Sequence, residues 1–172
     1  MDRRTRCQIL LLHRTPYTSL PAETIPGQPR PGHWLDLSQT WRLNHELAHI
    51  ACKRLVGEIQ INLYDELVAD ALGMSASLGI FDADLFRRGL GLSPEGHPSS
   101  DARAHVHVST LEETKHHTVF QMVLQRAVEL DRLLQQNQRS LEPMPLLAKL
   151  VNGRLDQPFS DGVCCKNDSS QP

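Results

Sequence analysis

Two short segments, at residues 45–49 and 66–70, constrain the fold of this chain more than any other feature of its sequence. The first reads His-Glu-Leu-Ala-His, an HExxH pattern, and the second reads Glu-Leu-Val-Ala-Asp. On a helix, a spacing of four residues places both imidazoles on one face, with a carboxylate beside them. The two segments can form a single site only if both are helical and antiparallel.

Periodicity predicts that both segments are helices. At 100° per residue, apolar side chains cover most of the first helix, which we expect to run from near Ser38 to Gly57. The second helix is expected to begin at Asn62 as its N-cap, and its only polar stripe carries Glu66 and Asp70. Because helices that are apolar nearly all round are buried, both are predicted to lie in the middle of the domain.

The rest of the chain predicts further helices and little β structure. Residues 7–13 and 104–108 could each form a short strand. A short helix is expected within residues 82–91, and a capping box at residues 109–112 is expected to open a long helix that ends near Asn137. We therefore predict a mainly α fold with at most a minimal β element.

Composition limits the classes of partner and the compartment. The 172 residues suit one domain, and a net charge of −2 without a strongly basic block argues against nucleic acid or an anionic membrane as main partner. The apolar run at residues 9–12 is too short for a signal-peptide core or a membrane span. The four cysteines lack the spacing of a disulfide framework, which predicts reduced thiols in a cytoplasmic protein.

The residue types in the two segments are those of a zinc site. His45 and His49 would turn two imidazole nitrogens toward one point, and Glu66 would complete a His₂Glu set with one position open. Glu46 cannot ligate beside its neighbour His45, so it would act as general base on a water whose pKa zinc lowers to about 7. Asp70 would accept the free N–H of a ligand histidine and fix its tautomer. One zinc ion per chain is expected.

The alternative is a buried helix whose histidines pair with carbonyl groups of the core. Burying four ionisable groups on two facing stripes is costly unless something satisfies them, which favours a metal. Cys52 falls on the same helix face as the histidines. It could be a fourth ligand, but a small core residue is the preferred interpretation. His105 and His107 are expected at the surface, with a role as oxyanion donor as the alternative. Aromatic residues are expected in the core or packed over the first helix: Tyr64, Trp34 and Trp41.

The pair of motifs resembles the gluzincin zinc metallopeptidases, in which HExxH supplies two ligands and a downstream Glu the third. The Glu-x-x-Ala-Asp form is similar to that of the membrane-linked CAAX-type peptidases and the small ImmA/IrrE-like cytosolic proteases. The resemblance covers about residues 41–74. It implies His45, His49 and Glu66 as the three zinc ligands. Glu46 would be the catalytic base and Asp70 a supporting carboxylate.

Together these observations predict a zincin-like helical domain at residues 38–153. An irregular segment that could contain a strand precedes it at 1–37, and a flexible polar tail follows at 154–172. The expected function is a zinc-dependent peptidase acting on a peptide or protein substrate. Because only residues 7–13 could supply a substrate-binding strand, a partner domain or a homo-oligomer could complete the cleft. One alternative is an inactive zincin-like domain, in which structural zinc holds the helix pair together and the surface binds a protein partner. The other is a metal-free helical interaction domain.

Overall fold

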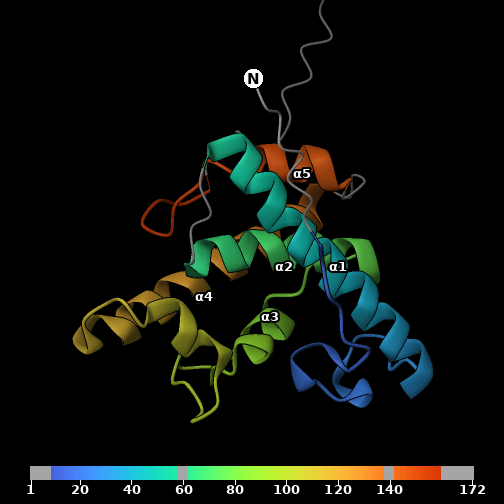
Figure 1. Cartoon of the computed structure of the whole chain (residues 1–172). Helices are drawn as coiled ribbons and strands as arrows, with labels where there is room; N and C mark the ends of the chain where they lie inside the picture. Colours follow the sequence, from blue (N-terminus) through green and yellow to red (C-terminus); the bar gives the residue numbers. More distant parts are fainter. Residues whose placement is uncertain (1–8, 58–61, 138–141, 160–172) are drawn as a thin grey trace, which may run out of the picture.

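The computed structural model describes residues 9–57, 62–137 and 142–159, and in these the protein is mainly helical, as predicted (Figure 1). Within these described ranges, three short 3-10 helices accompany five α-helices. In chain order the elements are η1 (Tyr17–Ser19), η2 (Ala22–Thr24), α1 (Pro31–Val56), α2 (Leu63–Leu78), α3 (Ala83–Leu90), η3 (Arg103–Val108), α4 (Glu113–Asn137) and α5 (Pro143–Leu150).

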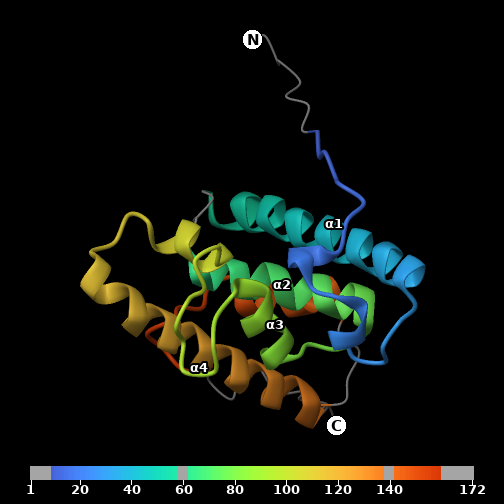
Figure 2. The same ribbon diagram turned by 90° about the horizontal axis from the view of Figure 1, so that it is seen from below.

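Helix α2 lies in the middle of the molecule, with α1 along one side and α4 on the other (Figure 2). Every residue of α2 from Leu63 to Ser75 except Asp65 is buried, as its apolar sequence predicts. Helix α1 differs from the expectation of full burial. It is buried where it packs against α2 and η1, and it leaves Leu47 and Leu55 exposed.

The ends of α1 and α2 follow from local chemistry. Helix α1 begins at Pro31 rather than near Ser38, and proline suits the first turn because its missing N–H would have no helical partner there. It stops at Gly57, which adopts a left-handed conformation (φ 96°). Asn62 caps α2 as predicted, its side-chain oxygen accepting from the backbone N–H groups two and three residues on, at 2.8 and 2.9 Å.

Both predicted strands are wrong in the described residues. Residues 9–13 form no strand, and residues 7 and 8 lie outside the described part. Residues 104–108 belong to η3, where Ala104 and Val108 are buried while Val106 is 63% exposed. Burial there skips Val106, so it does not follow the alternation of the sequence. The β structure of the described residues is one isolated bridge, between Leu92 and Pro98.

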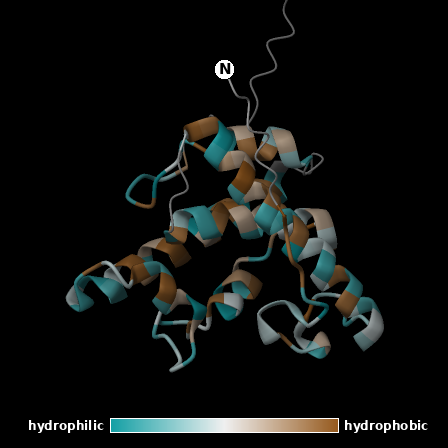
Figure 3. Ribbon diagram, in the orientation of Figure 1, coloured by the Kyte–Doolittle hydropathy of each residue, from teal (hydrophilic) through white to brown (hydrophobic). Residues whose placement is uncertain are grey.

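Helices α3 and α4 lie where the sequence predicts them, but α4 begins later than expected. Helix α3 lies within residues 82–91, and α4 ends at Asn137, both as expected. The capping box is not formed, because Ser109 Oγ donates to the carbonyl of Val106 and α4 begins only at Glu113. Hydrophobic residues recur along the helices, whereas the loop between α3 and η3 is largely hydrophilic (Figure 3). Of the tail predicted at 154–172, residues 160–172 lie outside the described part.

Two findings bear on the predicted setting of the protein. No helix in the described ranges combines the length and the apolar character needed to cross a membrane. Cys52 is buried with a free thiol, whereas Cys7, Cys164 and Cys165 lie outside the described residues.

Candidate metal centre

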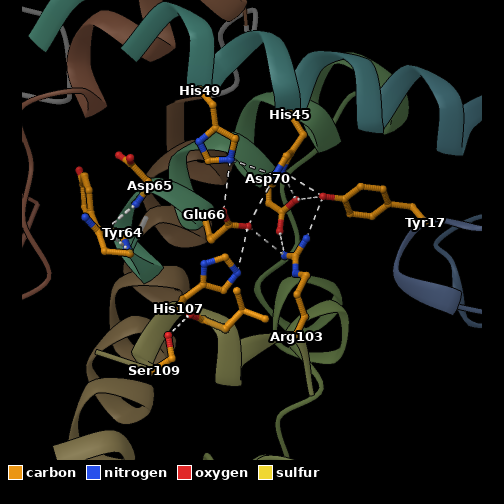
Figure 4. Close-up of polar contacts among 12 residues, drawn as sticks. Tyr17, His45, His49, Tyr64, Asp65, Glu66, Asp70, Arg103, His107 and Ser109 are labelled. Carbon is orange, nitrogen blue, oxygen red and sulfur yellow. Dashed lines mark hydrogen bonds and ion pairs between the residues drawn. The ribbon is translucent and has the colours of Figure 1, made fainter. Parts of the chain in front are cut away.

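Helices α1 and α2 bring the side chains of His45, His49 and Glu66 together. One ligand atom from each lies within 4.8 Å of the others. The two Nε2 atoms are 3.1 Å apart, and the Glu66 oxygens lie 3.2 Å from Nε2 of His49 and 3.5 Å from Nε2 of His45. Figure 4 shows both imidazoles descending from α1 toward the carboxylate on α2.

The chemistry of this group suits a metal cation. Two imidazole nitrogens and a carboxylate are a common ligand set for zinc and for other divalent transition metals. Burial strengthens the case, since the side chains of His45 and Glu66 are only 7% and 8% exposed and that of His49 is 17% exposed. The three residues could therefore hold a metal ion.

Asp70 orients His45 from behind. Oδ1 of Asp70 lies 2.8 Å from Nδ1 of His45, and the carboxylate is almost completely buried. Because an ionised carboxylate only accepts hydrogen bonds, Nδ1 of His45 carries a proton, and Nε2 is the ring nitrogen turned toward His49 and Glu66. By contrast, the buried Nδ1 of His49 has no hydrogen-bond partner in the described residues.

Three further side chains donate to Asp70. Tyr17 Oη and Trp41 Nε1 reach Oδ1 at 2.6 and 3.0 Å, and Arg103 pairs with Oδ2 at 2.5 Å. None of these donors was expected from the sequence. Trp41 could have been found, because it precedes His45 by one helical turn. Tyr17 and Arg103 lie in segments without helical periodicity, where no signal marks them.

The 3-10 helix η3 closes the side of the site opposite α1. It places the guanidinium of Arg103 3.8 Å and Nε2 of His107 3.7 Å from the same Glu66 oxygen (Figure 4). The surface position expected for His107 is wrong, since its side chain is 9% exposed. His105 is exposed as expected, with Nε2 2.9 Å from the carbonyl oxygen of Ser99.

Burial and neighbouring charges act in opposite directions on the two carboxylates. Burial alone would raise the pKa of Asp70, but Arg103 and His45 outweigh it and hold that pKa well below its usual range. Glu66 shows the same balance, because the hydrogen bond with His49 and the charges of His45 and Arg103 lower its pKa. Both groups are therefore anions at neutral pH, the form that binds a cation.

The pKa values of His49 and His107 shift in opposite directions. Burial by itself lowers the pKa of His49, but the hydrogen bond to Glu66 and the charges of Glu66, Asp65 and Glu46 raise it overall. Burial dominates at His107 and lowers its pKa, helped by Arg103, so this ring is neutral at neutral pH. Glu46 itself is half-buried on α1, beside His45.

Cys52 and Tyr64 line a pocket and do not join the group of three ligands. The pocket has a volume of about 610 Å³ between α1, α2, α4 and residues 151–156. Burial raises the pKa of the Cys52 thiol to about 11, so a small core residue describes it better than a ligand. Tyr64 is buried as expected, and its hydroxyl donates to the carbonyl of Leu150 at 2.8 Å.

Comparison with known proteins places the chain in a family without assigning it an activity. A model described as "Family of unknown function (DUF7005)" matches residues 3–155, which include all the side chains around Glu66 and Asp70. No curated protein matches the chain, and no solved structure does. The protein belongs to this DUF7005 family of unknown function.

Proposed function

We propose that this protein is a zinc-dependent peptidase whose metal is held by His45, His49 and Glu66. The observation that carries the proposal is the convergence of two imidazole nitrogens and a carboxylate oxygen within 4.8 Å. Glu46, the residue after His45 on α1, is the proposed general base. The resemblance of the two motifs to gluzincins supports the same reading. The substrate class is a peptide or protein, and a cytoplasmic location remains a prediction.

The chain supplies a residue for each proton movement of peptide hydrolysis. Bound zinc supplies a Lewis acid that polarises the scissile carbonyl and acidifies water. Glu46 takes the proton from the attacking water as the oxygen bonds to the carbonyl carbon, and delivers it to the amine nitrogen as the C–N bond breaks. His107 faces the site from η3, and its neutral ring can donate an N–H to the carbonyl oxygen as negative charge develops there.

Metal analysis together with a peptide-library digest tests this proposal. Wild-type protein is expected to contain about one zinc per chain and to cleave peptides in a reaction that a chelator stops and zinc restores. Glu46→Gln should abolish cleavage and keep the zinc, whereas His49→Ala should lose both. Cleavage by Glu46→Gln at the wild-type rate would show that the assigned general base is wrong.

The burial of the site favours one second candidate, an inactive zincin-like domain that binds a protein partner. The side chains of His45 and Glu66 are less than one tenth exposed, which suits a structural metal. This candidate predicts stoichiometric zinc without cleavage of any library peptide. If the protein is a peptidase whose cleft needs a partner domain or a homo-oligomer, cleavage should appear when that partner is added. The inactive domain should cleave no peptide even then. Purified protein without metal, whose melting does not respond to zinc, would contradict both.

A further inference from the structure

Asp70 receives hydrogen bonds from side chains of three separate elements. His45 and Trp41 come from α1, Tyr17 from η1, and Arg103 from η3. Three of these donors share Oδ1, while Arg103 takes Oδ2. A buried carboxylate with both oxygens occupied cannot rotate without breaking one of these bonds, so its direction toward His45 is fixed.

Tyr17 is held in place on every side. Its backbone N–H donates to the buried hydroxyl of Ser38 at 3.0 Å, and its ring stacks on Trp41 with centroids 4.5 Å apart. Its hydroxyl lies 3.0 Å from Nδ1 of His45, in addition to the bond with Asp70. The two residues that follow it have φ angles of 51° and 60°, a left-handed conformation that non-glycine residues rarely adopt. The turn thus holds Tyr17 at a conformational cost.

Arg103 connects the hydroxyl and the carboxylate. One of its terminal nitrogens donates to Tyr17 Oη at 3.0 Å, and the other pairs with Asp70. Because the hydroxyl accepts from Arg103, its own proton is directed to Asp70. The planar guanidinium therefore sets the relative position of two groups that lie behind His45.

We propose that Tyr17 and Arg103 are positioning residues of the metal centre. They hold Asp70 so that it keeps His45 in the Nδ1–H form, with Nε2 aimed at the metal, and so they set metal affinity without touching the metal. The inference rests on the metal site of the proposed function and is independent of peptide cleavage. Mutating the hydrogen-bond partners that surround a set of metal ligands typically lowers metal affinity by about 10- to 100-fold.

Tyr17→Phe tests the inference, and Tyr64→Phe is its matched control. Both variants keep a buried ring and lose a hydroxyl group. The Tyr17 hydroxyl bonds to Asp70 and accepts from Arg103, whereas the Tyr64 hydroxyl donates to the carbonyl of Leu150 and does not reach Asp70. Zinc affinity is measured by competition with a chromophoric chelator, and cobalt(II) absorption reports the ligand geometry. Tyr17→Phe should weaken zinc binding by about tenfold or more and alter the cobalt band, while Tyr64→Phe should leave both unchanged.

Two further measurements support the test. One uses a second variant, in case Tyr17→Phe does not fold, and the other observes the tautomer of His45 directly. Arg103→Lys keeps the positive charge beside Asp70 but cannot bridge it to Tyr17, so its zinc affinity should also fall. Imidazole ¹⁵N shifts of metal-free wild type should report the Nδ1–H form at His45.

Several results would overturn the inference. These are wild-type zinc affinity in Tyr17→Phe, an equal loss of affinity in both phenylalanine variants, or an Nε2–H form at His45. A wild type that binds no metal overturns the inference and the proposed function together. A wild type that binds zinc but cleaves no peptide overturns only the proposed function.

Discussion

His105 and His107 stand two residues apart on η3, yet only His107 faces Glu66. If His107 donates to the carbonyl oxygen during hydrolysis, His107→Ala should lower kcat by about 100- to 1000-fold. Zinc content should stay at the wild-type level, because the three ligands are untouched. His105→Ala is the matched control and should leave kcat unchanged. Equal activities in the two variants would remove His107 from the mechanism.

The thiol of Cys52 should be unreactive in the native protein. Burial raises its pKa to about 11, so the thiolate, the reactive form, becomes abundant only as the pH approaches that value. At pH 8 only about one thiol in a thousand is ionised. We expect no alkylation of Cys52 by iodoacetamide at pH 8 and rapid alkylation in denaturant, with peptide mass spectrometry as the measurement. Native labelling at this pH would show that the side chain is accessible.

At the scale of residues, spacing predicts which side chains meet when they share a helix. The four-residue spacing places His45 and His49 together, and one polar stripe on α2 carries Glu66 and Asp70 to face them. Tyr17 and Arg103 reach the same site from segments without periodicity. Their positions depend on how η1 and η3 pack against the helices, which no local pattern encodes.

At the scale of elements, Gly73 sets how closely α2 can approach α1. A β-carbon at Gly73 would overlap the ring of Trp41 and lie 2.9 Å from its backbone oxygen. Gly73→Ala should therefore lower the free energy of unfolding by about 1–3 kcal/mol. It should also weaken zinc binding, because it separates the helices that carry the ligands.

Gly32 offers the control for that substitution. It lies in the first turn of α1, and a β-carbon there would meet no atom within 4 Å. Gly32→Ala should be neutral or stabilise the protein by up to about 1 kcal/mol, because alanine favours the helix. Chemical denaturation compares the two variants. An unchanged midpoint for Gly73→Ala would mean that the helices can separate without loss.

The two elements that the sequence misassigns have separate physical causes. Residues 104–108 alternate between apolar and polar side chains as a strand would, but Ala104 and Val108 are buried while Val106 faces out. Packing against the body of the protein selects the 3-10 helix over the local alternation. Helix α1 extends back to Pro31 through a stretch whose prolines and glycines predict irregular backbone, because proline is tolerated in a first turn.

At the scale of the whole molecule, the core does not depend on the metal site. Buried apolar residues extend continuously from Tyr17 through all five α-helices. Removing zinc with a chelator should therefore leave the far-UV circular dichroism unchanged and lower only the melting temperature. At zinc concentrations 100 times the Kd, the bound metal should add about 2.7 kcal/mol of stability. Loss of helical signal on chelation would instead make zinc a requirement for folding.

The bond between Arg103 and Tyr17 joins residues 86 positions apart in the chain. Contacts of such long range form only after the loop between them has closed, and closure is slow relative to helix formation. The ligands themselves come from neighbouring helices and can meet earlier. A refolding chain should therefore first bind cobalt weakly, and its cobalt affinity should rise when η1 and η3 dock. Cobalt absorption would then report the last step of folding.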